Sequence, residues 1–400
     1  MKVLIWDKLT TLKNSGGASG YMWNIKSYID SNRQDINNVF FYSDIISKND
    51  SAQNLICRLL LTILYKLKFK IIARFINDYF YIGALSKEEE RIIKSFDFVH
   101  FHNLSMAHAY CRKVKQLGVR TIITTHTPEP NIDEISALNC FLKKYLRDKP
   151  FLRNWFIHRE LEIFDGCDYI MFPVEDVIEC YTSVSDLYKY YFDNICRDKL
   201  FYVPTAIIDN TPSKNELVVD NLQLPANSKC ICYIGRHNTV KGYDYLKEIA
   251  KIIFEQRRNV YFIIGGKAED STPVDSPNWI ELGWVNTTDL LKEIDVFVLA
   301  NKQTYFDIIT LEILRAGVPL ITTPTGGNKY IKKINNGGVT FIPINNADEA
   351  AKTILNVLDS DKSTLGSLSR QLYENYFCVN KYIQTYTIEL NNLNGKKYQH

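Results

Sequence analysis

The feature that most limits what this chain can fold into is an alternation of short apolar runs with amphipathic helical patterns. Between residues 229 and 345 the apolar runs end at glycine or a small polar residue, and they cover residues 231–234, 260–264, 296–299 and 320–323. Runs of this length fit buried strands. Between the first two, one helical stripe is formed by Leu246, Ile249, Ala250 and Ile253. Strands that alternate with helices pair in parallel through right-handed crossovers, so an α/β domain is predicted.

The first half of the chain repeats this alternation. Short strands are predicted at residues 3–6, 40–42, 98–101, 121–125 and 169–172, and a helix at 21–29 follows a loop of small residues. The expected fold is therefore two α/β domains. We assign residues 1–205 to the first domain, 206–228 to a polar linker with room for one short strand, and 229–372 to the second domain. A C-terminal helix and tail, residues 373–400, are expected to return to the first domain, with 395–400 frayed.

Composition excludes several classes of protein. The chain has 400 residues, 46% hydrophobic and 23% charged, which suits two globular domains. A net charge of +3 is too small to indicate a nucleic-acid partner. The nine cysteines are scattered without a Cys-x-x-Cys pair, which favours a reducing cytoplasm. We expect neither a signal peptide nor a membrane-spanning segment.

In a parallel sheet of this kind, ligands bind beyond the carboxyl ends of the strands. Residues that directly follow predicted strands therefore converge on one edge although they are far apart in sequence: Arg236, Gly265, Gly266, Asn301 and Gly326. Two cations, Arg236 and Lys241, lie on one loop, and a carboxylate, Glu312, lies on a later helix. This combination suits a ligand with a diphosphate at one end and hydroxyls at the other, and a sugar nucleotide has that shape.

Four motifs together resemble family 4 glycosyltransferases of the GT-B fold. They are Gly16-Gly17, Gly235-Arg236 with Lys241-Gly242, Phe306 through Glu312 to Gly317-Val318-Pro319, and Gly326-Gly327. The resemblance covers most of the chain and is densest from residue 230 to 345. It implies two Rossmann-like domains facing a cleft, a nucleotide-sugar donor, and transfer with retention of the anomeric configuration.

The resemblance gives Arg236 and Lys241 the catalytic role of stabilising the departing diphosphate, with no metal. Fixed cations stabilise that developing charge most in the transition state. The alternative is a solvated basic loop. Glu312 lies in an otherwise apolar helix, where a carboxylate is costly unless it is hydrogen-bonded. The family's matching residue binds the ribose hydroxyls, and the alternative for Glu312 is a bond to Arg315 or to solvent.

The chain departs from the family at Thr304. Relatives commonly carry a second glutamate there, eight positions before Glu312, and it contacts the donor sugar. We therefore expect a different recognition of the sugar, in which Asp307 reaches a hydroxyl. Backbone N–H groups at the start of a helix can hold an anion, so we include Tyr305, Phe306 and Ile308 among the donor-binding residues.

Further donor-binding candidates surround this loop. Gly16, Gly17 and Gly266 let the main chain approach a ligand closely, and an ordinary turn is the alternative. Trp284 either stacks on the base or fills the core, and Val285 contacts the base through its main chain.

His126 follows a strand, and the resemblance places it near the reacting centre. We interpret it as a positioning residue, and the alternative is a loop histidine without a ligand. His100 and His102 share a strand face, but without a third ligand they indicate core hydrogen bonding rather than a metal site. Residues 359–361 spell Asp-Ser-Asp and are interpreted as a solvated loop. No metal and no cofactor are expected.

Residues 51–82 are unusually basic. Arg58, Lys66, Lys68, Lys70 and Arg74 face only one acidic residue, Asp78, for a local charge of +4. Lys66, Lys70 and Arg74 fall four residues apart and form one ridge if the segment is a single helix. Such a helix binds an anionic membrane surface, or it packs on the first domain with its charges in water. Both interpretations stay open.

The predicted function is that of a retaining, metal-independent hexosyltransferase. It would move a sugar from a nucleotide sugar, with a UDP-sugar as the preferred donor, to a glycan acceptor on a lipid carrier. The process would be the biosynthesis of a capsule or O-antigen polysaccharide. The predicted location is the cytoplasm, at the inner face of the cell membrane. The alternatives are a non-catalytic nucleotide-sugar-binding subunit, and a GT-B phosphorylase or epimerase.

Overall fold

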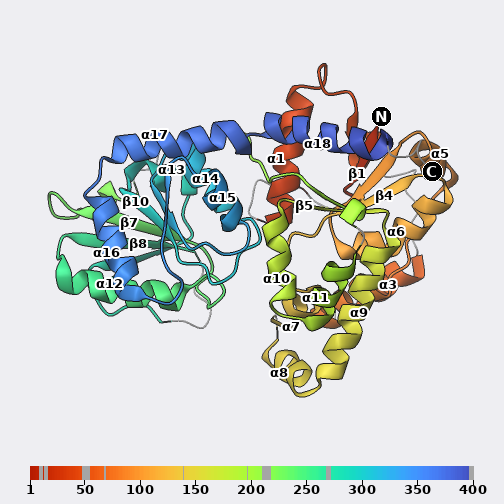
Figure 1. Cartoon of the computed structure of the whole chain (residues 1–400). Helices are drawn as coiled ribbons and strands as arrows, with labels where there is room; N and C mark the ends of the chain where they lie inside the picture. Colours follow the sequence, from red (N-terminus) through yellow and green to blue (C-terminus); the bar gives the residue numbers. More distant parts are fainter. Residues whose placement is uncertain are drawn as a thin grey trace. The chain divides into compact units, whose positions relative to one another are not determined.

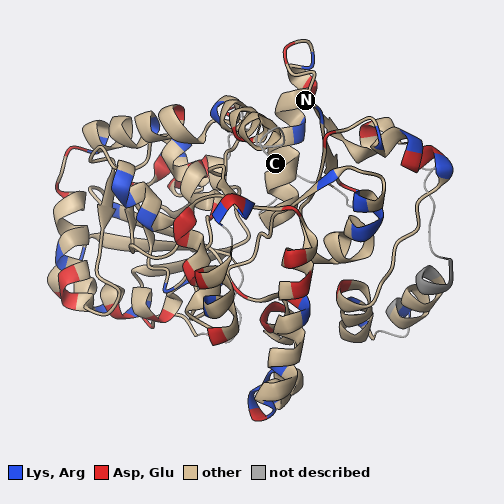
Figure 2. Ribbon diagram, turned by 45° about the vertical axis from the view of Figure 1, so that its right-hand side comes forward, with Lys and Arg blue, Asp and Glu red and all other residues tan. Residues whose placement is uncertain are grey.

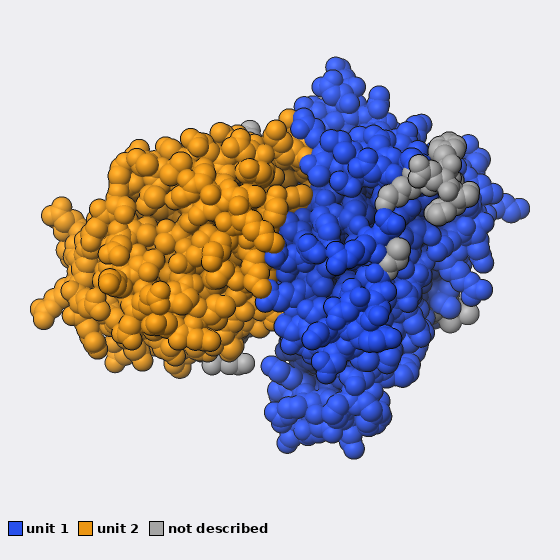
Figure 3. Space-filling view, viewed as in Figure 1, with its two compact units in different colours: residues 1–203, 384–400 blue, residues 204–383 orange. Residues whose placement is uncertain are grey.

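The computed structural model describes residues 1–8, 12, 17–46, 55–66, 69–137, 139–195, 197–209, 218–266 and 272–395. The chain divides into two compact units, residues 1–203 with 384–400 and residues 204–383 (Figure 3). Each unit contains one six-stranded sheet in which all neighbouring strands are parallel. The predicted fold class of two α/β domains is confirmed.

The sheet of unit 1 has the order β2-β1-β3-β4-β5-β6. Its strands are β1 (Val3–Trp6), β2 (Val39–Phe41), β3 (Phe98–Phe101), β4 (Arg120–Ile123), β5 (Tyr169–Phe172) and β6 (Leu200–Tyr202). β1 and β3 are buried over their whole length, as expected for strands that helices cover on both faces. The chain adds β2 on one side of β1 and all later strands on the other side, beginning with β3. The position between β1 and β3 is therefore the switch point of unit 1.

The helices of unit 1 pack around this sheet or, as α8 does, lie farther from it (Figure 1). They are α1 (Gly17–Ser31), α2 (Tyr42–Ile45), α3 (Leu55–Lys66), α4 (Lys70–Tyr79), α5 (Lys87–Ile93), α6 (Leu104–Gln116), α7 (Asn131–Ala137), α8 (Cys140–Asp148), α9 (Pro150–Gly166), α10 (Glu179–Thr182) and α11 (Asp186–Asn194). Polar side chains fix several of their starts. Asn103 caps α6, and Ser86 forms a capping box with Glu89 at α5.

The sheet of unit 2 has the order β12-β11-β10-β7-β8-β9. Its strands are β7 (Lys229–Ile234), β8 (Val260–Gly265), β9 (Trp279–Gly283), β10 (Val296–Leu299), β11 (Leu320–Thr322) and β12 (Val339–Phe341). Its helices are α12 (Tyr243–Gln256), α13 (Thr287–Glu293), α14 (Ile308–Ala316), α15 (Asn328–Ile334), α16 (Ala347–Leu358) and α17 (Lys362–Leu372). The order reverses between β7 and β10, so their carboxyl ends open the crevice in which such sheets bind ligands.

The last helix, α18 (Val379–Gly395), begins in unit 2, and residues 384–400 belong to unit 1. Its Tyr386 hydroxyl lies 2.8 Å from Nδ1 of His100, and Arg120 donates to the carbonyl of Leu393 at 3.1 Å. The expected return of the C-terminal helix to the first domain is thus confirmed. The predicted frayed tail lies outside the described residues apart from residue 395.

Of three local predictions, two differ from the structure in detail and the third, a single basic helix, is wrong. The helix expected at 21–29 begins earlier, at Gly17. Residues 218–228 contain a single 3-10 turn, Asp220–Leu222, and no strand in this described part of the linker. The basic segment forms two helices, α3 and α4, rather than one, so its basic residues do not form a continuous ridge.

The Asp-Ser-Asp sequence is solvated as expected, and it has a structural role. Asp361 is exposed and caps α17 by accepting from the backbone N–H groups of Ser363 and Thr364. Asp359 pairs with Arg257 at 2.7 Å. No helix in the described part of the chain is both long and apolar enough to cross a bilayer.

Candidate functional site

The loops that follow β7 and β10 meet at the switch point of unit 2. The backbone N–H groups of Lys302 and Gln303 both donate to the carbonyl of Val240, at 3.0 and 3.2 Å. The hydroxyls of Thr323 and Thr325 both donate to the carbonyl of Asn301. Three segments that are distant in sequence are therefore held together at the carboxyl edge of the sheet.

Glycines make this close approach of backbones possible. Gly242 has φ +66°, and a Cβ there would lie 1.7 Å from the carbonyl oxygen of Ala300. Gly266 has φ +119°, and a Cβ there would lie 1.9 Å from the carbonyl oxygen of Gly235. The sequence pointed to Gly266 as a residue that a ligand approaches, and the structure shows that another loop approaches it.

Lys241 and Asp307 form an ion pair across the two loops. The Lys241 ammonium lies 2.7 and 2.6 Å from the two carboxylate oxygens of Asp307, and both side chains are half-buried. The side-chain amide of Asn301 donates to the same carboxylate at 2.8 Å. Burial acts to raise the pKa of Asp307, but Lys241, Asn301 and Thr304 outweigh it and lower that pKa. Asp307 is therefore ionised at neutral pH.

Asn301 is fully buried, and its side-chain oxygen has no hydrogen-bond partner among the described residues. An unpartnered buried carbonyl is costly, so its presence beside Asp307 marks this loop as a place where a donor group would be accommodated. The sequence placed Asn301 directly after a strand, but its hydrogen bond to Asp307, 6 residues later, could not be predicted from the spacing.

The remaining residues of this loop are mostly buried. Thr304 is fully buried, Tyr305 and Phe306 are 6% and 7% exposed, and the Phe306 ring packs 5.7 Å from that of Phe377. Asp307 occupies the N-cap position of α14 without capping it by its side chain. The side chains of Tyr305 and Phe306 thus serve packing, and Ile308 begins the helix, so only their backbone groups remain as candidates for binding.

Arg236 and Lys241 differ in their surroundings. Arg236 is exposed, and its guanidinium has no ion-pair partner within the described parts of the chain. Lys241 is neutralised by Asp307. The sequence placed two cations on one loop, and the structure leaves one unpaired and pairs the other.

Glu312 is half-buried on α14. Burial raises the pKa of its carboxyl, and the nearby charge of Arg315 lowers it by less. The Arg315 guanidinium donates to the carbonyl of Ile208 at 3.0 Å. In the described residues the Glu312 carboxylate has no hydrogen-bond partner. A partly desolvated, unpartnered carboxylate is a strong acceptor for a diol.

Trp284 is 92% exposed, so it does not fill the core. It follows Gly283, whose carbonyl accepts from the backbone N–H of Gly266 at 2.7 Å. Val285 lies half-buried against Gly265. Both candidates therefore lie beside the glycine loop after β8.

In unit 1, His126 follows β4 and contacts residues that follow β3 and β1. Its Nε2 lies 3.1 Å from Nδ1 of His102, and its ring packs 4.7 Å from Tyr21 of α1. Gly17, with φ +73°, begins that helix, whereas Gly16 lies outside the described residues. Gly17 and His126 are thus linked through α1 at the switch point of unit 1.

The three histidines of this region are neutral at pH 7. Burial lowers the pKa of His126 to about 4 and that of His100 to about 3, and it lowers the pKa of His102 well below its ordinary value. His100 bonds to Tyr386 and Thr124, both at 2.8 Å. His100 therefore has the predicted role of hydrogen bonding in the core. Within the described residues, no group of three potential ligands is placed to hold a metal.

Comparisons with known proteins support a glycosyltransferase. Residues 228–360, which include the switch point of unit 2, match the family model described as glycosyl transferases group 1. An uncharacterised 41.2 kDa protein in the cps region of Klebsiella pneumoniae is 24% identical over 168 residues, which are 39% of this chain and 45% of that protein. The uncharacterised glycosyltransferase MJ1607 of Methanocaldococcus jannaschii is 27% identical over 165 residues, 38% of this chain and 42% of its own. The chain thus matches less than half the length of these curated relatives.

Solved structures share the whole fold. Anabaena Alr3699/HepE in complex with UDP and glucose aligns with a TM-score of 0.60 at 12% identity, over 98% of this chain and 99% of that one. Sucrose-phosphate synthase from Thermosynechococcus elongatus aligns with a TM-score of 0.61 at 13% identity, over 99% and 100% of the two chains. At these identities the likeness shows the fold, which is GT-B.

Proposed function

We propose that this chain is a glycosyltransferase whose nucleotide-sugar donor binds at the switch point of unit 2. A UDP-sugar is the preferred candidate for that donor. The observation that carries the proposal is the Lys241–Asp307 pair, which joins the loops after β7 and β10 in the unit that matches the glycosyltransferase model. Arg236 is exposed on the same loop as Lys241, and Glu312 is a half-buried carboxylate on the helix that follows Asp307. Cations suit a diphosphate, and an unpartnered carboxylate suits a ribose diol.

The chemistry assigned to these residues is the stabilisation of a leaving group. When the bond between the anomeric carbon and the diphosphate oxygen breaks, the electron pair stays on that oxygen. Arg236 and Lys241 would stabilise the resulting charge, and a fixed cation contributes most where water is excluded. No metal is required in this proposal, and the sugar would be transferred with retention of configuration.

Asp307 has a second part in the proposal. Its carboxylate holds the Lys241 ammonium in place, and it supplies a negative acceptor in a loop where Thr304 supplies none. A sugar hydroxyl that donates to Asp307 would replace part of that ion pair, and Lys241 could then turn to the phosphate. Recognition of the sugar and activation of the leaving group would be coupled in this way.

Unit 1 would carry the acceptor. His126 is neutral and is held by His102 and Tyr21, so we assign it to positioning rather than to proton transfer. We propose a glycan on a lipid carrier as the acceptor and surface polysaccharide assembly as the process. The Klebsiella relative in a cps region and the UDP complex of Alr3699/HepE support these choices. The proposed place of action is the inner face of the cell membrane.

One assay separates the proposed function from its alternatives. The protein is screened by thermal shift against UDP-, GDP- and TDP-sugars, because a ligand that binds only the folded state raises the melting temperature. The donor that stabilises best is then incubated with glycan acceptors, and release of nucleoside diphosphate is measured. We expect acceptor-dependent release, and a fall of about 10²-fold in Arg236→Ala and in Lys241→Ala.

The other outcomes identify the other functions. Donor binding with no release across the acceptor panel would support a non-catalytic nucleotide-sugar-binding subunit. Donor conversion without acceptor would indicate an epimerase, and dependence on free phosphate would indicate a phosphorylase. Turnover at the wild-type rate in both variants would remove the assignment of Arg236 and Lys241.

A further inference from the structure

Exposed apolar side chains gather on one part of unit 1. Among the described residues, sixteen large hydrophobic side chains are exposed, and eleven of them lie within residues 59–82 and 141–155. These two stretches contribute α3, α4, α8 and the first half of α9. A scatter of single exposed apolar residues is normal, whereas a cluster of this size indicates an interaction surface.

A groove of about 800 Å³ joins the two stretches. Phe69, Ile72 and Phe75 line it from the side of α4, and Phe141 and Tyr145 line it from the side of α8. Phe141 is 83% exposed and Tyr145 is 51% exposed. Because they are four residues apart on α8, they lie on the same face of that helix.

Aromatic contacts extend the groove along α9. The Phe75 ring lies 5.1 Å from that of Phe156, whose ring lies 4.9 Å from that of Trp155. Trp155 stacks on Phe80 at 6.3 Å, and both are about half exposed. The apolar surface is therefore continuous from α8 to the end of α4. We define its exposed members as the aromatic face: Phe69, Ile72, Phe80, Phe141, Tyr145 and Trp155.

The helix that carries Phe141 and Tyr145 also carries exposed basic residues. From Cys140 to Lys149, α8 and the residue after it carry Lys143, Lys144, Arg147 and Lys149 against a single acid, Asp148, and all five are exposed. Lys70, at the rim of the groove, is exposed as well. Figure 2 shows basic residues on α8, the lowest element in that view and in Figure 1.

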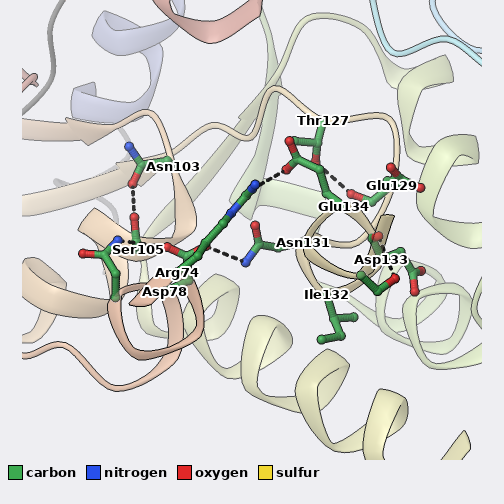
Figure 4. Close-up of polar contacts among 12 residues, drawn as sticks. Arg74, Asp78, Asn103, Ser105, Thr127, Glu129, Asn131, Ile132, Asp133 and Glu134 are labelled. Carbon is green, nitrogen blue, oxygen red and sulfur yellow. Dashed lines mark hydrogen bonds and ion pairs between the residues drawn. The ribbon is translucent and has the colours of Figure 1, made fainter. Parts of the chain in front are cut away.

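Arg74, which the sequence assigned to the basic ridge, does not add to the exposed positive charge. Arg74 pairs with Glu134 at 3.0 Å and with Asp78 at 3.5 Å (Figure 4). Its charge is satisfied inside unit 1, in a network that also holds Asn131. The positive charge near the aromatic face therefore comes mainly from α8, which the sequence did not single out.

We propose that the aromatic face docks unit 1 on the surface of a membrane rich in anionic lipid. Aromatic side chains favour the boundary between headgroups and acyl chains, where an apolar ring and a polar edge are both accommodated. Lysine and arginine beside them are attracted to anionic headgroups. An anionic lipid surface complements the exposed positive charge of α8 and Lys70, whereas an apolar protein partner would leave that charge without a counter-charge.

The test is sedimentation of the full chain with vesicles, without any donor, so its outcome does not depend on transferase activity. One set of vesicles contains phosphatidylcholine only, and the other contains phosphatidylglycerol as well. We expect binding to the anionic vesicles and at least tenfold weaker binding to the neutral ones. The change Lys143→Gln/Lys144→Gln/Arg147→Gln should weaken binding to anionic vesicles by about 10²-fold, since each basic residue near the surface contributes about fivefold.

The apolar anchor is tested separately with Phe141→Ser/Tyr145→Ser, which should weaken binding at least tenfold at unchanged net charge. Control changes lie outside the face: Tyr190→Ser, at a side chain 72% exposed, and Lys251→Gln/Lys352→Gln on exposed positions of unit 2. All variants are first compared by thermal unfolding, because α8 buries only Leu146 and its surface changes should leave stability nearly unchanged.

Three results would overturn the proposal. One is equal sedimentation with neutral and anionic vesicles, and another is equal loss of binding in the controls. The third is a concentration-dependent dimer, measured by light scattering, that Phe141→Ser/Tyr145→Ser abolishes, because the face would then bind a second copy of the chain.

Discussion

Replacing Gly242 by alanine tests whether the close contact between the loops after β7 and β10 shapes the candidate site. The added methyl would lie 1.7 Å from the carbonyl oxygen of Ala300, roughly half the usual carbon–oxygen contact distance. That oxygen belongs to a fully buried backbone group at the end of β10, so no side-chain rotation can relieve the clash. The two loops must move apart, and Lys241 must move away from Asp307.

A second glycine separates the clash from the strain of the backbone. Gly283 has φ +68°, close to the +66° of Gly242, but a Cβ there would meet nothing within 4 Å. Alanine at either position carries the left-handed penalty of about 1–2 kcal/mol. Only Gly242→Ala adds an overpacking cost of about 1–3 kcal/mol. At roughly 3 °C per kcal/mol for a unit of this size, Gly242→Ala should melt about 6 °C below Gly283→Ala.

The assay is thermal unfolding of the wild type and both variants, followed by titration with UDP. A displacement of about 1 Å in a positioned group costs on the order of 10²-fold, so Gly242→Ala should also bind UDP much more weakly. If both variants melt at the same temperature and bind UDP alike, the loops are not locked together as described, and the reasoning fails.

Three further predictions address single groups. Glu312→Ala should weaken UDP binding about tenfold by calorimetry while leaving binding of inorganic diphosphate unchanged, and an equal loss for both ligands would refute contact with the ribose. Asp307→Asn should lower the free energy of unfolding by about 2 kcal/mol, because it leaves a half-buried Lys241 without its counter-charge; an unchanged denaturant midpoint would contradict this. Unit 1 should lose stability as pH falls from 6.5 to about 4, because the unfolded chain protonates its histidines before folded His126 does. His126→Asn should remove about 3 kcal/mol of that dependence, and a melting temperature equally pH-dependent in both proteins would speak against a neutral buried imidazole.

The strands and the switch point were predictable because local signals coincide there. Apolar runs that end at glycine mark β7 and β8, and their helical connections show the period of an amphipathic helix. Gly317 ends α14 in the left-handed conformation and Asn346 caps α16, which are positions that these residue types favour. The same signals predicted that Arg236 lies just after a strand and that Glu312 lies on a helix.

The pairings within the site could not be read from the sequence. Lys241 and Asp307 are 66 residues apart, and His100 and Tyr386 are 286 residues apart. Such contacts depend on which strands are neighbours, and a single sequence specifies strand order only loosely. Lys241 was therefore interpreted as an available cation, although the fold gives it a counter-charge.

The break between α3 and α4 was missed for a different reason. Residues 55–79 contain neither glycine nor proline, and their apolar residues are nearly continuous, so no local signal ends the first helix. The contribution of α8 to the aromatic face was missed because Phe141 and Tyr145, four residues apart, look like part of a core-facing stripe. Burial decides between these interpretations, and burial is a property of the fold.

Titration of UDP into the wild type, Arg236→Ala and Arg258→Ala tests the central claim most directly. Arg258 is an exposed arginine at the opposite end of the neighbouring strand β8, so its removal changes the net charge equally. We predict that Arg236→Ala raises the Kd for UDP at least tenfold and that Arg258→Ala leaves it unchanged. Equal Kd values for all three proteins would show that the diphosphate does not bind where β7 ends.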